Sequence, residues 1–349
     1  MERELGLLAS AVSQLWDRAV LLQLTGVLVE KPPLLDLSPS DPHRFWEQSA
    51  VSRPHPVRIV REWESIDGPE WREVELAGES DGPGSHPGAR QLVASAHLLR
   101  SARPAPLALI IHGYAIPFTG FDRYIAWRMR RRGVQTVRID LPFHLRRTVP
   151  GEHSGDHYFS IDPAHTRATV RQSVEDAAAL VAWARREVAS EVRVLGTSLG
   201  GLIAALLTAL VELERTLLVA PLCDPAASFT ERPPGVMQRR MGMLGEGDGH
   251  WGRDRASARA ALEGALAPLV ARRLDPRTSP ERITLVRPAR DLVVGPGPMD
   301  DLAAAWHIPV WRYPHGHITV MNAPGVARRI IEHLTLPLDG AGQELALAG

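Results

Sequence analysis

The chain has 349 residues, 44% of them hydrophobic, which is enough for a large core in one or two domains. Its 40 basic and 40 acidic residues balance, so the composition predicts no overall attraction to nucleic acid or to an acidic membrane. The only cysteine, Cys223, excludes an intrachain disulfide framework and favours a reducing compartment, so we expect a cytoplasmic protein.

The N-terminal segment is apolar but interrupted by polar side chains. It starts with the acidic run Met1–Leu5, where a secretory signal would be basic, and Gln14, Asp17, Arg18 and Gln23 break the apolar stretch. Neither a signal peptide nor a transmembrane segment is predicted. Apolar residues recur at three- and four-residue spacing at Leu5, Leu8, Val12, Leu15, Ala19 and Leu22. This spacing predicts an amphipathic helix packed on the core; docking to a membrane surface or a dimer contact is the less favoured alternative.

The sequence pattern up to residue 100 predicts an antiparallel extension of the central sheet. A proline-rich connector from Lys31 to Pro42 leads to three β-rich runs separated by Gly, Pro, Ser and Asp. The predicted strands are Val57–Trp63, Trp71–Leu76 and Gln91–Leu99. We expect residues 1–100 to belong to the same domain as the core that follows, residues 101–340.

From Leu107 the pattern changes to strands that alternate with helices. The predicted strands are Leu107–Ile111, Val134–Ile139, Glu191–Leu195, Thr216–Ala220, Ile283–Val286 and Val310–Tyr313. The predicted helices are Phe121–Arg132, Ala164–Val188, Leu202–Leu210, Met299–Trp306 and Val326–Leu334. This alternation predicts an α/β fold, with a mostly parallel central sheet and crossover helices on both faces.

The alternation stops between residues 223 and 281. That stretch contains glycines, methionines and an alanine-rich run, Ser257–Arg273, which is typical of a helix. An insertion here would lie above the carboxyl ends of the strands, so we predict a helical cap over a ligand site. Flexible thioethers suit an adaptable apolar pocket, which makes Met237 and Met241 candidate substrate contacts.

One motif carries the strongest chemical signal. The apolar run Glu191–Leu195 is followed by Gly196-Thr197-Ser198-Leu199-Gly200 and then by a buried helical run. A serine at a sharp strand-to-helix turn needs small residues two positions before and after it, and both are glycines. Such a nucleophile elbow exposes the hydroxyl of Ser198 beside the positive end of the helix.

A serine nucleophile needs a base and an orienting acid, and both occur downstream on loops that follow strands. Asp291 follows Ile283–Val286, and His317 follows Val310–Tyr313. Asp224 is the alternative acid and His315 the alternative base.

In these residues the chain resembles the α/β-hydrolase fold, over residues 107–336. The resemblance implies Ser198 as nucleophile, Asp291 as orienting acid and His317, in a Gly-His context, as general base. It also implies an oxyanion hole of two backbone N–H groups. One is that of Leu199, and the other comes from the His112-Gly113 loop, from Tyr114 or, as a fallback, Ala115. His112 itself is expected to shape this loop.

Two further polar clusters remain. In Asp140–Arg147, which resembles a segment frequent in the family, Leu145 stands where a glycine is usual. His144 and Arg146 are candidate substrate contacts there. Arg146 and Arg147 could grip a carboxylate or phosphate, although a solvated surface is the favoured interpretation. In the other cluster, the spacing of His153 and His157 could suit a metal, but a loop at the pocket entrance is preferred.

We therefore predict a serine hydrolase of the carboxylesterase or lipase kind, acting on a small-molecule acyl ester, or on a thioester or amide. No cofactor and no metal are expected. The alternatives are an acyltransferase, a lipase that works at a lipid surface, and a hydrolase-like binding protein without activity. The preference for esters is an analogy from the fold. The oligomeric state is left open.

Overall fold

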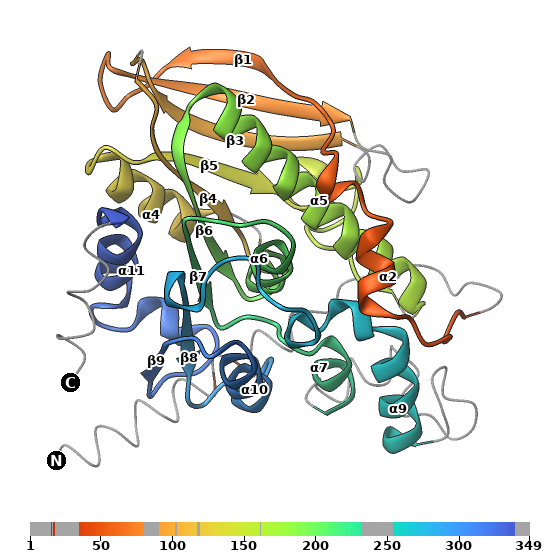
Figure 1. The fold of residues 1–349 in the computed structure, drawn as a ribbon. Helices are drawn as coiled ribbons and strands as arrows, with labels where there is room; N and C mark the ends of the chain where they lie inside the picture. Colours follow the sequence, from red (N-terminus) through yellow and green to blue (C-terminus); the bar gives the residue numbers. More distant parts are fainter. Residues whose placement is uncertain are drawn as a thin grey trace, which may run out of the picture.

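The structure, a computed structural model, describes residues 15, 17, 35–79, 91–101, 103–116, 119–160, 162–231 and 254–338. Its centre is a sheet of nine strands in the order β1-β2-β3-β5-β4-β6-β7-β8-β9 (Figure 1). The strands are β1 (Val57–Glu64), β2 (Trp71–Glu79), β3 (Gln91–Leu99), β4 (Ala105–Ile111), β5 (Gln135–Asp140), β6 (Ala189–Thr197), β7 (Arg215–Val219), β8 (Ile283–Pro288) and β9 (Val310–Tyr313). The sequence predicted each of them to within a few residues.

The direction of pairing divides the sheet into two parts. From β1 through β3 to β5 the neighbouring strands are antiparallel, and from β5 to β9 they are parallel. The predicted antiparallel extension and the mostly parallel core are therefore both confirmed. The carboxyl ends of the parallel strands meet at one edge of the sheet, where ligands bind in folds of this kind.

Alternate residues of the parallel strands face two separate cores. In β4, Leu107, Leu109 and Ile111 belong to one hydrophobic cluster, whereas Ala108 and Ile110 belong to the other. Because successive side chains of a strand point to opposite faces, a strand buried on both faces must be apolar throughout. This is why β4 appears in the sequence as an apolar run.

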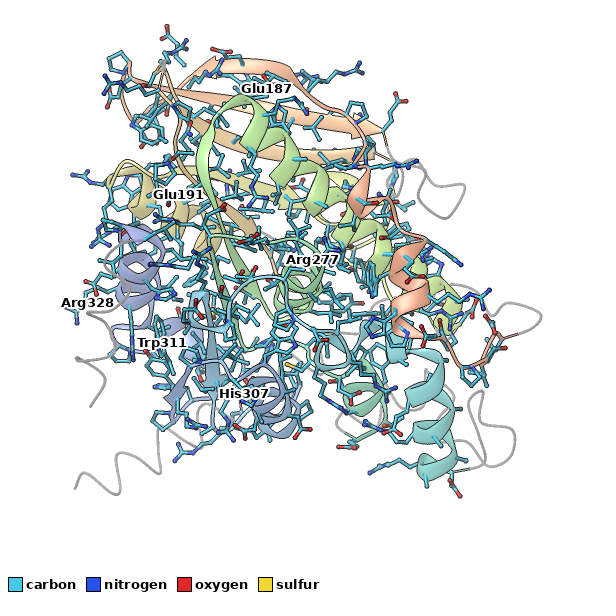
Figure 2. All side chains as sticks on the ribbon, in the orientation of Figure 1. Glu187, Glu191, Arg277, His307, Trp311 and Arg328 are labelled. Atoms are coloured by element: carbon cyan, nitrogen blue, oxygen red, sulfur yellow. The ribbon has the colours of Figure 1, made fainter. Side chains whose placement is uncertain are left out.

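Helices cover both faces of the sheet. The helices are α2 (Pro42–Glu47), α4 (Gly120–Arg130), α5 (Pro163–Glu187), α6 (Leu199–Leu210), α7 (Pro225–Glu231), α9 (Arg255–Ala265), α10 (Pro296–Trp306) and α11 (Val326–Thr335). Buried residues of α4 and α11 belong to one core, and those of α5, α6 and α10 to the other. The amphipathic helix α11 buries Ile330 and Leu334, while Arg328 projects into solvent beside Glu332 (Figure 2).

Two sequence predictions for helices were wrong. The run Ser257–Arg273 is not one helix, because α9 ends at Ala265 and two short 3-10 turns follow. Pro268 in the first turn lacks the N–H that a continuing helix would need. The proline-rich connector ends in a helix, α2, whose first residue is Pro42 and whose N-cap, Asp41, accepts a hydrogen bond from the Arg44 N–H. That pair of residues is a start signal the prediction overlooked.

The predicted N-terminal helix lies largely outside the described residues. Of its residues, Leu15 is 62% exposed and Asp17 is fully buried. This is the reverse of the predicted apolar face. None of the helices among the described residues is both long and apolar enough to cross a membrane.

The predicted cap is described only at its two ends. Helices α7 and α9 flank residues 232–253, which lie outside the described part of the chain, as do the candidate substrate contacts Met237 and Met241. The cap, and the division of the chain at residue 100, stay predictions.

Candidate functional site

Ser198 lies in a strained turn between β6 and α6. Its φ of 55° and ψ of −113° are outside the conformations that side-chain-bearing residues prefer. A Cβ at Gly196 would overlap the carbonyl group of Gly200, and one at Gly200 would overlap that of Ile111. The two glycines are therefore required by the close packing of helix on strand, and this packing holds Ser198 at the end of β6.

Three side chains from distant parts of the chain form one hydrogen-bonded series. The hydroxyl of Ser198 donates to Nε2 of His317 at 2.8 Å, and Nδ1 of His317 donates to Oδ2 of Asp291 at 2.7 Å. His317 is 6% exposed and Asp291 1% exposed, whereas Ser198 is half-buried. The structure thus brings together the three residues that the sequence analysis selected, in the order that proton transfer requires.

The other carboxylate oxygen of Asp291 is held by the backbone. The N–H groups of Val293, Val294 and Gly295 donate to Oδ1 at 2.8, 2.9 and 3.4 Å. Gly295 is the N-cap of α10, so the positive end of that helix also faces this region. These bonds leave Oδ2 directed at His317.

Asp291 and His317 shift each other's pKa values so that the charged form of each is favoured. Burial favours the neutral carboxyl of Asp291, but the charge and hydrogen bond of His317 and the N–H groups of Val294 and Val293 outweigh it, so its pKa is lowered. Burial likewise opposes the imidazolium of His317. The charge and hydrogen bond of Asp291, together with the charge of Asp17, nevertheless hold the pKa of His317 above its ordinary value of 6.5. A raised pKa makes His317 a stronger base toward Ser198.

The alternative acid and base lie in other surroundings. Asp224 accepts a hydrogen bond from the Ala227 N–H at the start of α7 and pairs with Arg259 at 3.1 Å. The backbone carbonyl of His315 accepts from the Arg290 N–H, and burial together with the charge of Arg290 lowers the pKa of its ring.

The predicted oxyanion loop follows β4 and is fixed by two buried histidines. Nε2 of His112 accepts from the Leu141 N–H at 3.1 Å, in keeping with its expected role in shaping the loop. Nε2 of His144 accepts from the Ala115 N–H at 3.0 Å. The fallback donor is therefore already engaged. Within the described residues the N–H of Tyr114 has no hydrogen-bond partner, which leaves it as the candidate donor opposite Leu199.

His144 is a correction to the sequence analysis. It is completely buried, and its Nδ1 lies 2.8 Å from the carbonyl oxygen of Pro142. Its two ring nitrogens are thus occupied by backbone groups, so it supports the predicted oxyanion loop from inside the protein. Gly155 packs against the same place, where a Cβ would come within 3.0 Å of Nε2 of His144.

The paired arginines have different environments. Arg146 is partly exposed and bonds to Asp140 at 2.7 Å and to Glu75 at 3.1 Å. Arg147 is 2% exposed and donates to Asp176 at 2.7 Å and to the carbonyl oxygen of Asp140 at 3.0 Å. The expected solvated surface is therefore wrong for Arg147, which ties the loop after β5 to α5.

The second polar cluster, around His153 and His157, does not have the geometry of a metal site among the described residues. His153 is almost entirely exposed, and within the described ranges no three His, Cys, Asp or Glu side chains gather as metal ligands. His157 lies 3.8 Å from Glu152.

Asp17 is the residue at this site that the sequence analysis missed. Its buried carboxylate accepts hydrogen bonds from the N–H groups of His317, Ile318 and Leu292 at 2.8, 3.0 and 3.3 Å. The only signal was a carboxylate inside an apolar segment. Nothing in the sequence indicates its contact with residues 300 positions away.

Two solved structures resemble the chain over most of its length. An acetyl xylan esterase from Paenibacillus sp. R4 aligns with a TM-score of 0.59 at 18% identity, over 86% of this chain and 96% of that one. Acetyl Xylan Esterase 1 from Thermoanaerobacterium sp. JW/SL YS485 aligns with a TM-score of 0.60 at 15% identity, over 91% and 97%. No protein-family model and no curated protein sequence matches. The chain has the α/β-hydrolase fold.

Proposed function

We propose that this protein is a serine hydrolase that cleaves carboxylic esters through an acyl-enzyme on Ser198. The observation that carries the proposal is the continuous series of hydrogen bonds from Ser198 through His317 to Asp291. A serine hydroxyl is a weak nucleophile at neutral pH, and this series supplies both the base that removes its proton and the acid that orients the base.

In the first half-reaction, Nε2 of His317 takes the hydroxyl proton as Oγ of Ser198 attacks the ester carbonyl carbon. The negative charge that develops on the carbonyl oxygen is met by the N–H groups of Leu199 and Tyr114. One such donor is typically worth about 3–4 kcal/mol in the transition state. His317 then gives its proton to the leaving alcohol oxygen, and the acyl group stays on Ser198.

In the second half-reaction, His317 removes a proton from water, and the resulting nucleophile attacks the acyl carbon. Collapse of this intermediate releases the carboxylic acid and returns the proton to Oγ of Ser198. Asp291 stays ionised throughout, in keeping with its lowered pKa, and stabilises the imidazolium that forms twice per cycle.

Ester substrates are proposed ahead of thioesters and amides. Both similar structures are of acetyl xylan esterases. Because their identity to this chain is low, they support ester chemistry only as an analogy of fold. The acyl and alcohol parts are left to experiment. A cytoplasmic location rests on the single cysteine and is likewise a proposal.

The test is hydrolysis of p-nitrophenyl esters of graded acyl length by the full chain and by Ser198→Ala. We expect turnover by the unchanged chain and a loss of about 10⁴-fold or more in the variant, with folding intact by circular dichroism. Equal turnover by the two proteins would remove Ser198 from the mechanism.

A further inference from the structure

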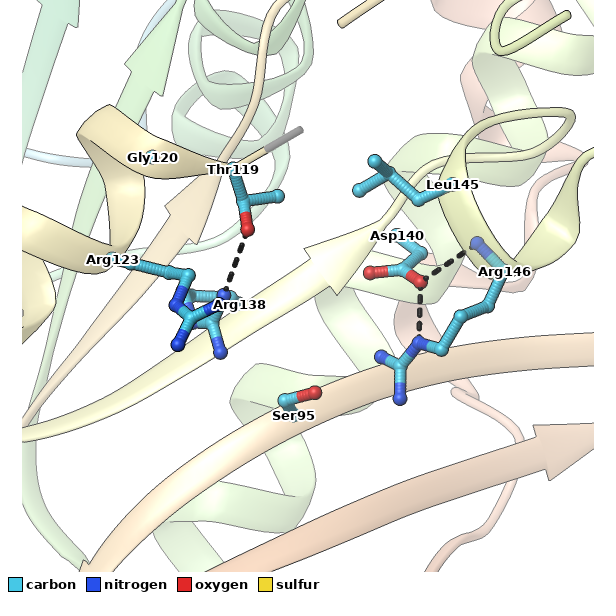
Figure 3. A pocket seen from close by; sticks show the side chains of 8 residues that line it. All are labelled: Ser95, Thr119, Gly120, Arg123, Arg138, Asp140, Leu145 and Arg146. Atoms are coloured by element: carbon cyan, nitrogen blue, oxygen red, sulfur yellow. Dashed lines mark hydrogen bonds and ion pairs between the residues drawn. The ribbon is translucent and has the colours of Figure 1, made fainter. Parts of the chain in front are cut away.

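A pocket of 490 Å³, whose lining does not include Ser198, lies over β3 and β5 on the face of the sheet that carries α4 (Figure 3). It is lined by Ser95, Thr119, Gly120, Arg123, Arg138, Asp140, Leu145 and Arg146. Three of these residues are arginines, and the proposed chemistry at Ser198 uses none of them.

The three arginines differ in how their charge is balanced. Arg146 bonds to two carboxylates, those of Asp140 and Glu75. Nη1 of Arg138 donates to the hydroxyl of Thr119 at 3.2 Å, while its buried Nε has no hydrogen-bond partner among the described residues. Arg123 makes no ion pair within the described part of the chain. Two of the guanidinium groups that line the pocket are therefore without a paired anion in the part of the chain that the structure describes.

Arg123 lies close enough to Arg138 to repel its charge, although carboxylates are also near. Burial lowers the pKa of Arg138, and the charge of Arg123 lowers it further. The opposing charges of Asp122, Asp140 and Glu73 do not reverse the shift. Burial also raises the pKa of Asp122 to about 6, although the charge of Arg138 acts against the rise. Charge repulsion between the arginines would be relieved by an anion placed between them.

The start of α4 adds a second, independent feature. Gly120, its first residue, lines the pocket, and the hydroxyl of Thr119 at the N-cap makes no capping hydrogen bond. The first N–H groups of a helix and its dipole favour a negatively charged ligand. The guanidinium groups and the helix start therefore converge on the same pocket.

We propose that this pocket binds a phosphate group, held by Arg123 and Arg138 at the start of α4. Two guanidinium groups and a helix start match a dianion with several oxygen atoms better than a single carboxylate, which one arginine can hold alone. The pocket is larger than a phosphate ion. The ligand is thus either free phosphate or the phosphate group of a small organic molecule.

The test is isothermal titration of the full chain with inorganic phosphate and with glycerol 3-phosphate at fixed ionic strength. Arg123→Gln removes one of the two guanidinium groups. Arg128→Gln, on the same helix but stacked on Trp127, removes an equal charge outside the pocket. We expect saturable binding to the unchanged chain and to Arg128→Gln, weakened at least tenfold in Arg123→Gln.

Tighter binding of glycerol 3-phosphate would identify an organic phosphate, and equal or weaker binding would identify free phosphate; both support the site. Absence of saturable binding by either probe would overturn it. So would equal weakening in the two variants, because this would show an attraction to overall charge and not to the pocket.

A second observation, the buried contacts of Asp17, carries an independent inference that rests on the proposed function. Its Oδ2 accepts from the N–H groups of His317 and Leu292, and its Oδ1 accepts from that of Ile318. One carboxylate thus joins the loop of the proposed base to the loop of the proposed acid. An asparagine cannot replace it, because its NH₂ group would face at least one of these N–H donors.

We infer that Asp17 is a positioning residue for His317. By fixing the backbone of the two loops, it keeps the imidazole between Ser198 and Asp291. Its charge adds to that of Asp291 in favouring the protonated ring, and these two carboxylates are the charged groups acting on His317. Loss of the charge should therefore move the titration of His317 to lower pH. A role in stability alone would leave that titration in place.

The test compares the rate constant for fluorophosphonate labelling of Ser198, measured against pH, in the full chain, Asp17→Asn and Asp36→Asn. Asp36 is an exposed N-terminal carboxylate paired with Arg167, which makes it a matched control. The folded fraction of each protein is measured by circular dichroism at each pH, and the rate constant is divided by it, so that partial unfolding does not mimic the effect. We expect Asp17→Asn to be slower, with its acidic limb moved to lower pH, and Asp36→Asn to be unchanged.

An unmoved acidic limb in Asp17→Asn would overturn the inference, whether or not labelling is slower. If the unchanged chain resists the probe, it is the proposed function that fails. The titration of the His317 imidazole by NMR then still tests Asp17, and an identical midpoint in Asp17→Asn would contradict the inference.

Discussion

Two regions built on the same sheet arrange charge in opposite ways. One is the Ser198 site, and the other is the arginine pocket, which is the pocket lined by Arg123, Arg138 and Arg146. At the Ser198 site, Asp17, Asp291 and His317 are nearly fully buried, and each is hydrogen-bonded to the others or to backbone N–H groups. In the arginine pocket, Arg123 and Arg138 have no paired anion among the described residues. Fixed, paired charges suit proton transfer between groups that stay in place. Unpaired charges suit a ligand that brings the missing charge.

The largest effect is expected at Asp291, the buried acid of the Ser198 site. In Asp291→Asn the ring of His317 loses the charge that orients it, and we expect kcat for ester hydrolysis to fall about 10⁴-fold. Asp224→Asn is the matched control, since Asp224 pairs with Arg259 and the start of α7. Equal losses in the two variants would contradict the assignment of the acid.

The next largest effect concerns the two adjacent arginines after β5, Arg146 and Arg147. Arg147→Ala removes the arginine partner of the fully buried carboxylate of Asp176, so we expect unfolding to become easier by about 3–5 kcal/mol in urea titrations. Arg146→Ala, with a partly exposed ion pair, should cost about 1 kcal/mol or less. If Arg147→Ala lowered the free energy of unfolding less than Arg146→Ala does, burial would not be the property that makes the ion pair of Arg147 the more important one.

A smaller effect is expected from the support of the oxyanion loop. His144→Phe removes the acceptor of the Ala115 N–H, which frees the loop that carries Tyr114. We expect kcat to fall about 10²-fold while KM changes little, because the lost interaction acts in the transition state. His153→Phe changes an exposed histidine and should keep full activity. A change in KM alone would place His144 in substrate binding, as the sequence analysis first suggested.

The smallest effect is a displacement along the pH axis. Only the neutral ring of His317 can accept the proton of Ser198, so activity is lost as the ring becomes protonated. Because its pKa is raised above 6.5, the acidic limb of kcat/KM should have its midpoint above pH 6.5. A midpoint below that value would show that burial, and not the charges of Asp291 and Asp17, controls this group.

The sequence was informative where a structural requirement is local. Strand β3 was predicted at its observed ends because turn residues flank an apolar run. Gly196 and Gly200, placed between an apolar run and a buried helical run, identified the turn at Ser198. The break of the predicted helix at Pro268 was missed, although the proline is a local signal for it.

What the sequence did not reveal depends on contacts between distant segments. Asp17 meets the loop of His317 only after the sheet has formed, and the burial of His144 depends on how the loop after β5 packs on the one after β4. The pocket exists because β3 pairs with β5, which brings Ser95 beside Arg138. No local pattern indicates that pairing.

The most direct measurement is the intact mass of the full chain and of Ser198→Ala after reaction with a fluorophosphonate probe. We expect one adduct, located on Ser198 by peptide mapping, and none on the variant. An unlabelled chain, or an adduct that persists in Ser198→Ala, would contradict this expectation.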